Sequence, residues 1–209
     1  LLHVLDFHRQ MPAYRAQQKE HLWRALPQPR AAERTVGIMG LGQLGSDLAG
    51  KLAALEFHIA GWSRAPKALP EVDNFAGPAG LAPFLARSEI VVCLLPLTPE
   101  TRGILSRETF ARLPRGAALI NLARGAHLIE DDLLAALDAG QLSGAALDVF
   151  AQEPLDPGHP FWSHPKITVT PHVATVATPE TSAPEVAENL KRAAEARPLI
   201  HTVDRARGY

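Results

Sequence analysis

The sequence predicts an α/β fold in which a doubly wound parallel sheet carries helices on both faces. From residue 35 onward, short β-branched apolar segments alternate with amphipathic or alanine-rich segments, as in strands joined by crossover helices. The apolar segments are nearly continuous, which is typical of strands buried on both faces. The expected strands are Thr35–Met39, Phe57–Trp62, Glu89–Leu95, Ala117–Leu122, Gly144–Val149 and Ile167–Thr170.

The helices expected between these strands are Leu44–Glu56, Gly80–Ala86, Arg107–Leu113 and Asp131–Ala139. Gly140 follows the last of them and is predicted to end it in a left-handed conformation, which a residue without Cβ adopts freely. The two ends of the chain differ from this alternating middle. Residues 8–23 form a polar helical pattern before the proline-broken linker Leu26–Arg30, and Pro179–Ala196 is predicted to be one long helix.

Composition excludes several classes of partner. The chain has 21 Lys+Arg against 22 Asp+Glu, and this balance argues against nucleic acid or an anionic membrane as a partner. No apolar stretch is long enough to span a bilayer. The single cysteine, Cys93, lies in an apolar segment and is predicted to be buried, which fits a cytoplasmic protein. His159 and His164 lie in a proline-rich loop without metal-ligand spacing, so no metal site is expected.

A glycine-rich turn follows the first expected strand. Gly40-Leu41-Gly42-Gln43-Leu44-Gly45 has the G-x-G-x-x-G spacing, with a strand before it and a helix after it. Gly40 permits the tight turn, Gly42 lets the backbone approach a pyrophosphate, and Gly45 lets the helix pack against the strand. The helix N-terminus then offers N–H groups and a partial positive charge to the phosphates. The context favours a dinucleotide-binding Rossmann domain over a glycine-rich turn that binds nothing.

The end of the second expected strand bears on the choice of cofactor. NAD-binding domains usually place Asp or Glu there to accept hydrogen bonds from the adenosine ribose. This chain has Ser63 and Arg64, with Lys67 close behind. A hydroxyl and cationic groups suit a 2′-phosphate, which a carboxylate would repel. The alternative is that these cations are solvated loop charges; the interpretation we favour is NADPH, with NADH as the second choice.

Polar segments follow the fourth, fifth and sixth expected strands at Asn121–Gly125, Leu147–Leu155 and Thr170–Ala174. Ligands bind at the carboxyl ends of strands in open parallel sheets. Taken singly, Arg124 could pair with a surface acid, Glu153 could be solvated, and His172 could be an ordinary loop histidine. Together, at one edge of a nucleotide-binding sheet, they favour an active site.

The order of these motifs resembles the D-2-hydroxyacid dehydrogenase family. The resemblance rests on Gly40–Gly45, Leu94–Gly103, Asn121–Gly125, Asp148–Pro154 and Pro171-His172. Trp62–Arg64 and the terminal residues 203–209 resemble the glyoxylate/hydroxypyruvate reductase A branch more narrowly. The resemblance implies that Arg124 binds the substrate, that Glu153 is the carboxylate behind the histidine, and that His172 is the proton donor.

The resemblance also implies cofactor contacts. Asp148 would lie near the nicotinamide and Thr101 would contact a phosphate. The full set of expected cofactor-binding residues is Gly40, Gly42, Gln43, Leu44, Gly45, Ser63, Arg64, Lys67, Leu95, Pro96, Thr101, Leu122, Ala123, Arg124, Asp148 and His172.

The expected reaction is NADPH-dependent reduction of a small 2-keto acid, such as glyoxylate or hydroxypyruvate, to the D-2-hydroxy acid. The cofactor supplies the hydride, His172 the proton, and Arg124 pairs with the substrate. A neighbouring Glu153 carboxylate would favour the imidazolium form of His172. Two alternatives stay open: another dehydrogenase of the family, of the phosphoglycerate or D-lactate type, and a non-catalytic NAD(P)H-sensing dimer. Arg124, Glu153 and His172 together favour the enzyme, because a sensor needs no proton donor.

Members of the family carry a second, substrate-binding lobe built mostly from residues before the cofactor domain, and that lobe is expected to be largely absent here. We expect residues 1–30 to be its remnant together with a linking and dimerisation helix. Residues 31–177 are the expected NAD(P)-binding domain, and 178–209 a C-terminal helix and tail returning to the substrate lobe. The chain is expected to be a fragment or truncated form that binds cofactor with little turnover, and to form a homodimer.

Overall fold

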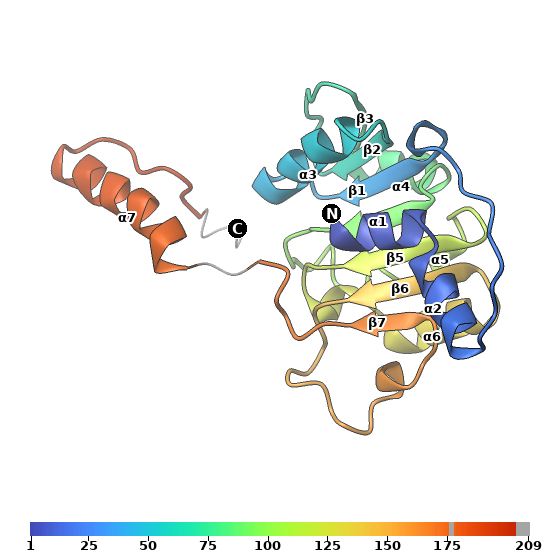
Figure 1. The fold of residues 1–209 in the computed structure, drawn as a ribbon. Helices are drawn as coiled ribbons and strands as arrows, with labels where there is room; N and C mark the ends of the chain where they lie inside the picture. The colour runs from blue at the N-terminus through green and yellow to red at the C-terminus, as the bar shows by residue number, and fades with distance from the viewer. Residues whose placement is uncertain (176–177, 204–209) are drawn as a thin grey trace. The chain divides into compact units, whose positions relative to one another are not determined.

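A computed structural model describes residues 1–175 and 178–203, and its contacts divide the chain into two units, Leu1–Pro171 and His172–Tyr209. The first unit is built on a seven-stranded parallel sheet with the order β3-β2-β1-β4-β5-β6-β7 (Figure 1). The strands are β1 Thr35–Met39, β2 His58–Ser63, β3 Val72–Ala76, β4 Ile90–Cys93, β5 Ala117–Asn121, β6 Leu142–Leu147 and β7 Ile167–Val169. The order reverses between β1 and β4, and such a reversal creates the crevice in which doubly wound sheets bind ligands. The predicted fold class is confirmed.

Helices cover both faces of this sheet. They are α1 Leu2–His8, α2 Met11–Lys19, α3 Gln43–Ala53, α4 Gly77–Leu85, α5 Arg107–Phe110 and α6 Glu130–Asp138, with short 3-10 turns at Ala31–Glu33, Gly125–His127 and Pro160–Trp162. One face packs on α1 and α3, and the other packs on α4, α5 and α6. Figure 1 shows α1 lying over one face of the sheet, in front of its central strands. Gly140, just after α6, has a φ of 65°, which confirms the expected left-handed helix end.

The strands divide their side chains between two apolar layers. Ile38 and Val92 point into the layer under α3, whereas Met39 and Cys93 point into the layer under α4 and α5. This alternation explains why the central strands are apolar at every position, since each face of the sheet is covered. Cys93 is fully buried, as expected, and burial raises the pKa of its thiol to about 12.

Strand β3 was not expected from the sequence. Its residues, Val72-Asp73-Asn74-Phe75-Ala76, carry two polar side chains and are only partly covered, because β3 lies at the sheet edge and pairs with β2 alone. It therefore lacks the continuous apolar pattern by which the other strands are predicted. With β3 counted, Asn121–Gly125 follows the fifth strand of the chain and not the fourth.

The N-terminal segment also differs from expectation, because residues 8–23 do not form one helix. Helix α1 ends at His8, Gln10 has a left-handed φ of 54°, and α2 then runs only from Met11 to Lys19. Within α1, Val4 is buried against the sheet, and Phe7 occupies the space that a Cβ at Gly144 would need. Helix α1 therefore belongs to the packed core of the first unit. The assignment of residues 1–30 to a substrate lobe stays a prediction.

The second unit contains the expected C-terminal helix, α7, at Pro179–Ala194. Thr178 caps it, with its Oγ1 accepting a hydrogen bond from Thr181 N–H at 3.3 Å. The expected domain boundary after residue 177 and the terminal residues 204–209 of the resemblance lie outside the described residues. Within the described part of the chain, none of the helices combines the length and apolar character that crossing a membrane requires.

Candidate active site

The glycine-rich turn has the geometry that a bound pyrophosphate requires. Gly40 has a φ of 100°, and a Cβ there would lie 2.7 Å from the carbonyl oxygen of Leu94. A Cβ at Gly45 would lie 1.9 Å from the carbonyl oxygen of Gly40. At Gly42, by contrast, an added Cβ would meet no described atom within 4 Å. The first and third glycines are thus required by the protein's own packing, whereas a Cβ at the second would enter open space.

The N-terminus of α3 adds hydrogen-bond donors to this turn. Gly42 is its N-cap residue and has no side chain to satisfy the first N–H groups of the helix. Gln43 and Leu44 open the helix and are exposed, Leu44 to 57%. A helix of 11 residues directs a partial positive charge at this point. The residues present therefore fit a dinucleotide phosphate.

The end of β2 lies beside the turn. The ammonium group of Lys67 donates a hydrogen bond to the carbonyl oxygen of Leu41 at 2.6 Å, so this charge lies on the turn itself. The hydroxyl of Ser63 donates to the carbonyl oxygen of Ala65 at 2.8 Å, and would have to rotate to donate to a phosphate. Arg64 is exposed, and its charge is among the causes that lower the pKa of Glu100, after hydrogen bonds from Thr98 and the backbone. One cationic group thus lies on the turn and another directly follows β2, the region in which the 2′-phosphate is predicted to bind.

The loop after β4 is held by Thr101. Its hydroxyl donates to the carbonyl oxygen of Pro96 at 2.8 Å and accepts from the N–H of Thr98 at 2.8 Å. Leu95, the first expected cofactor contact in this loop, is 7% exposed. Thr101 therefore shapes the loop, and its direct contact with a phosphate stays a prediction.

The loop after β5 carries Leu122, Ala123 and Arg124. Arg124 is exposed, and its Nη1 donates to the carbonyl oxygen of Ala123 at 2.6 Å. A guanidinium has five N–H bonds, so this contact leaves donors for a carboxylate. Asn121, fully buried, closes the loop: its Oδ1 accepts from Ala123 N–H and its Nδ2 donates to the carbonyl oxygen of Arg124, both at 3.2 Å.

His127 holds the same loop from the other side. It is fully buried, its Nδ1 accepts from Arg124 N–H at 3.2 Å, and its Nε2 lies 3.3 Å from the carbonyl oxygen of Pro96. Burial lowers the pKa of His127, so the ring is neutral near pH 7 and can accept at Nδ1 while donating from Nε2. The sequence analysis included Asn121 in the Asn121–Gly125 motif without giving it a role, and it missed His127. Each of the two is a polar residue among apolar neighbours in the sequence, and this pattern does not show which groups it binds.

The loop after β6 lies directly against the arginine loop. A Cβ at Gly125 would lie 1.8 Å from the carbonyl carbon of Phe150, so the two backbones are in contact. Glu153 is exposed, and its Oε1 accepts from Phe150 N–H at 2.9 Å. Asp148 is 1% exposed and accepts a 2.5 Å hydrogen bond from the hydroxyl of Thr170.

The carboxyl edge of the sheet therefore carries one continuous row of predicted site residues, from the glycine-rich turn to the loop after β6. The predicted proton donor, His172, is the first residue of the second unit. Its backbone has a left-handed φ of 54°, which is uncommon for a residue other than glycine. The pairing of His172 with Glu153 stays a prediction.

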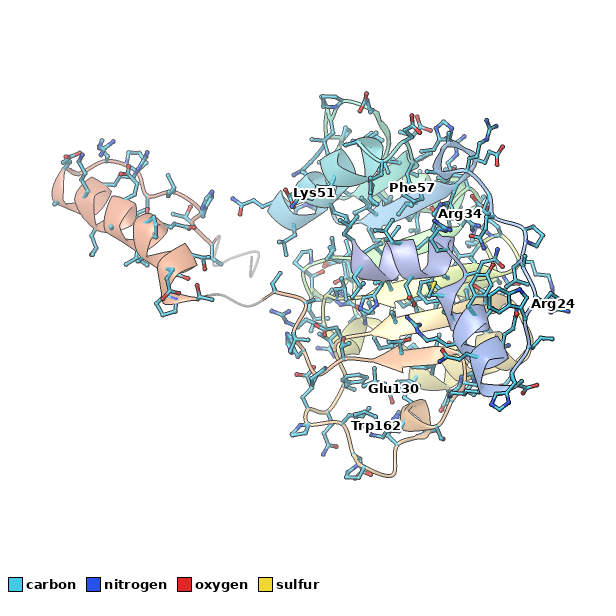
Figure 2. The ribbon with its side chains drawn as sticks, viewed as in Figure 1. Arg24, Arg34, Lys51, Phe57, Glu130 and Trp162 are labelled. Carbon is cyan, nitrogen blue, oxygen red and sulfur yellow. The ribbon has the colours of Figure 1, made fainter. Side chains whose placement is uncertain are left out.

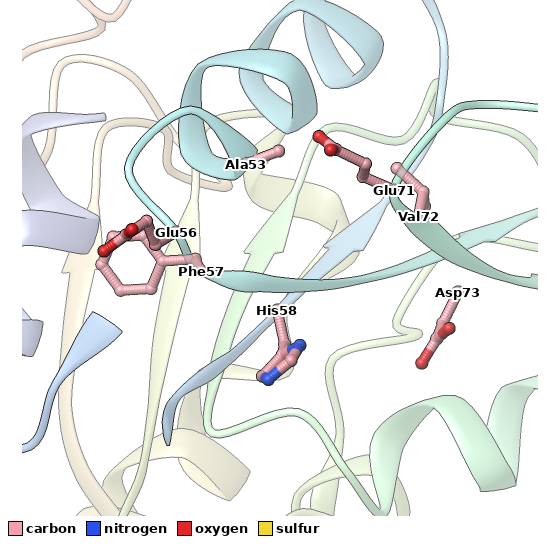
Figure 3. A pocket seen from close by; sticks show the side chains of 7 residues that line it. All are labelled: Ala53, Glu56, Phe57, His58, Glu71, Val72 and Asp73. Atoms are coloured by element: carbon pink, nitrogen blue, oxygen red, sulfur yellow. The ribbon is translucent and has the colours of Figure 1, made fainter. Parts of the chain in front are cut away.

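A hollow of about 510 Å³ lies at the opposite, amino edge of the sheet, where β2 and β3 begin. Figure 3 shows that its carboxylates, on Glu56, Glu71 and Asp73, point in different directions, so they do not form a common binding point. Among the described residues, no group of three or more His, Cys, Asp or Glu side chains could hold a metal ion.

The two histidines considered for a metal site contact carboxylates of α6. His159 Nε2 lies 3.2 Å from Glu130, and His164 Nε2 lies 3.5 Å from Asp138. Glu130 lies on the side of the first unit that also carries Trp162 (Figure 2). These contacts attach the 155–166 loop to α6 and give both histidines a structural partner.

Comparison with known proteins identifies the family. Residues 1–174 match the family described as D-isomer specific 2-hydroxyacid dehydrogenase, NAD binding domain. The chain belongs to this family. The glycine-rich turn and the edge loops described above are thus those of a 2-hydroxyacid dehydrogenase cofactor domain.

The chain is similar to proteins of known function and structure, among them the following three. The chain is 46% identical over 206 residues to glyoxylate/hydroxypyruvate reductase A of Yersinia enterocolitica serotype O:8 / biotype 1B, covering 99% of this chain and 66% of the relative. It is similar to the NADPH-dependent glyoxylate/hydroxypyruvate reductase of Sinorhizobium meliloti, solved with NADP and sulfate, at 45% identity and a TM-score of 0.94, covering 100% of this chain and 67% of that one. A phosphoglycerate dehydrogenase of Lactobacillus plantarum is 31% identical with a TM-score of 0.79, covering 97% and 67%. The chain thus spans about two thirds of the length of these relatives.

Proposed function

We propose that this chain is the cofactor domain of an enzyme that reduces glyoxylate or hydroxypyruvate with NADPH to the D-2-hydroxy acid. The observation that carries the proposal is the row of groups at the carboxyl edge of the sheet, where a phosphate-binding turn, cationic residues and Arg124 lie on adjoining loops. The higher identity to glyoxylate/hydroxypyruvate reductases, 46% and 45% against 31% for the phosphoglycerate enzyme, supports this substrate class.

NADPH is the proposed cofactor because cationic side chains lie where the adenosine ribose would bind. Lys67 reaches the glycine-rich turn, and Arg64 lies at the end of β2, where an NAD-binding domain usually has a carboxylate. The complex of the Sinorhizobium meliloti relative with NADP supports the same choice. Gly40, Gly42 and Gly45 would hold the pyrophosphate, with the first N–H groups of α3 as donors.

The chemistry follows from the groups at the edge. When bound, NADPH supplies the hydride that reduces the keto carbon. Arg124 pairs with the substrate carboxylate and fixes the keto carbon in place; its own loop is held by Asn121 and His127. His172 gives a proton to the keto oxygen, with Glu153 as the proposed carboxylate behind the histidine.

A titration of this chain with NADPH and NADH, followed by tryptophan fluorescence, tests the cofactor. Tighter binding of NADPH is expected, and equal binding would remove the NADPH assignment while keeping the family. Loss of NADPH absorbance with glyoxylate and hydroxypyruvate then tests the reaction, in a protein that joins this chain to a substrate lobe of the family.

In that assay Arg124→Gln should raise KM for the keto acid, and His172→Ala should lower kcat. Unchanged turnover in His172→Ala would show that another group donates the proton. A protein that binds NADPH and reduces no keto acid would favour the alternative of a nucleotide sensor.

A homodimer is part of the proposal. The segment that follows α2 exposes apolar side chains, with Trp23 fully exposed and Leu22 48% exposed beside a groove of about 620 Å³. Apolar surface of this kind marks interaction sites, and a second copy is the commonest partner. Light scattering coupled to size-exclusion chromatography should show a dimer; a monomer at high concentration would contradict it. A cytoplasmic location is proposed as well, supported by the single buried cysteine.

A further inference from the structure

The edge strand β3 contributes one side chain to the region of the proposed 2′-phosphate site. The connection from β2 to β3 begins at Arg64 and contains Lys67. Asn74, on β3, contacts this connection through its side-chain amide: Oδ1 accepts from Lys67 N–H at 3.4 Å, and Nδ2 donates to the carbonyl oxygen of Lys67. Both backbone polar groups of Lys67 are thus bound by one side chain.

The position of Asn74 in the sheet explains how it reaches Lys67. Asn74 is paired with Gly61 of β2, and a Cβ at Gly61 would lie 2.7 Å from a methyl group of Leu41. Paired residues of parallel strands point to the same face, so Asn74 lies on the face that packs against the glycine-rich turn. The neighbouring Asp73 points to the other face, where its carboxylate binds Arg87 at 2.6 Å.

We infer that Asn74 is a positioning residue for cofactor specificity, which holds Lys67 where its ammonium group meets the 2′-phosphate of NADPH. The inference rests on the proposed function, since it assumes that the adenosine end of NADPH binds between β2 and the turn. The ammonium of Lys67 is already placed there, 2.6 Å from the Leu41 carbonyl oxygen. It carries three N–H donors, so it can keep this contact and still donate to a phosphate oxygen.

Backbone anchoring matters because a lysine side chain is long and flexible. An exposed lysine loses side-chain entropy when its ammonium is fixed at one point, and a mobile backbone adds to that loss. With the backbone of Lys67 bound on both sides by Asn74, only the side chain remains to be ordered. NADH has no 2′-phosphate, so its binding does not use this arrangement, and the ratio of the two dissociation constants isolates the role of Asn74.

The experiment measures the NADH-to-NADPH ratio of Kd for this chain and its variants by fluorescence titration. Lys67→Met should lower the ratio about tenfold, as expected for the loss of a charged hydrogen bond. Asn74→Ala should lower it about three- to fivefold, on the order of one ordinary hydrogen bond. In the double variant, Asn74→Ala should add nothing to Lys67→Met, because the two act through one ammonium group. Asp73→Ala, on the opposite face of the same strand, is the control and should leave the ratio unchanged.

Four results that differ from these expectations would overturn the inference. If Asn74→Ala weakened both cofactors equally, Asn74 would serve only the fold of the edge; thermal unfolding of the same variant would show the matching loss of stability. Additive effects in the double variant would mean that Asn74 acts apart from Lys67. If the unaltered chain bound NADPH and NADH alike, the NADPH assignment itself would fail and the inference with it. If the chain preferred NADPH and Asn74→Ala kept the full preference, the inference alone would fail.

Discussion

The glycine-rich turn contains two glycines whose replacement by alanine should affect different properties. One replacement should lower stability, and the other should weaken cofactor binding. In Gly45→Ala, the new Cβ would lie 1.9 Å from the carbonyl oxygen of Gly40, whereas ordinary contacts begin at 3.4 Å. The two atoms must therefore separate by about 1.5 Å. The Gly40 oxygen cannot move freely, because Gly40 packs on Leu94 and its N–H donates to the carbonyl oxygen of Trp62 at 2.8 Å.

The strain must then be relieved by moving α3 away from β1. Leu48 and Leu52 anchor α3 in the core and would lose part of their packing. Overpacking of a core costs about 1–3 kcal/mol, and a contact between backbone atoms belongs at the upper end of that range, about 3 kcal/mol. For a chain of this size, such a loss lowers Tm by roughly 6–12 °C.

Gly42→Ala is the matched variant. The new Cβ meets no described atom within 4 Å, and a φ of −73° suits alanine, so the free energy of unfolding should change by less than about 1 kcal/mol. The methyl group would instead occupy the space of the pyrophosphate. NADPH should bind on the order of 100-fold more weakly, as for the loss of one or two charge-assisted hydrogen bonds.

Urea unfolding and NADPH titration of both variants give the test. Gly45→Ala should lose stability, and Gly42→Ala should lose cofactor affinity while keeping stability. The reasoning would be refuted if Gly42→Ala bound NADPH as tightly as the unaltered chain, or if Gly45→Ala unfolded at the same urea concentration.

Three further predictions follow from the burial or exposure of single residues. The Cys93 thiol, with its pKa raised to about 12, should not react with a thiol reagent at pH 8 in the folded protein, and should react once urea unfolds it; a rapid reaction without urea would contradict its burial. Burial lowers the pKa of His127 in the folded state below its unfolded value of about 6.5, so the unfolded chain binds more protons and stability falls as the pH drops below about 6.5. In urea titrations from pH 7 to pH 5, the free energy of unfolding should fall less steeply for His127→Gln than for the unaltered chain, by up to about 1.4 kcal/mol per pH unit. Equal slopes for the two proteins would mean that folding leaves the pKa of His127 unchanged. Gly50→Ala, in the exposed interior of α3 with no described atom near the added Cβ, should raise the free energy of unfolding by about 0.5–1 kcal/mol, and a loss of stability would contradict the open surroundings.

The sequence predicted the central strands well because strands that are buried on both faces are apolar at every position. Val91, Val92 and Cys93 are apolar in succession, and no exposed helix face produces that pattern. The edge strand β3 could not be found in this way, since Asp73 and Asn74 lie where the sheet is only partly covered. The sequence also did not show that the helix is interrupted at Gln10. A single left-handed residue between two short helices leaves the helical spacing of polar and apolar residues nearly unchanged.

The sequence by itself determined the fold class, the phosphate-binding turn and the residue types of the predicted site. These depend on spacing along the chain: G-x-G-x-x-G needs only its flanking strand and helix, and polar residues at strand ends mark the carboxyl edge. Only the tertiary structure decided which groups touch across the chain. The contacts of His127 with Arg124 and Pro96, of Gly125 with Phe150, and of Asn74 with Lys67 join separate loops or strands. Such contacts arise when the strands align side by side, and a one-dimensional pattern carries no distance between residues of different loops.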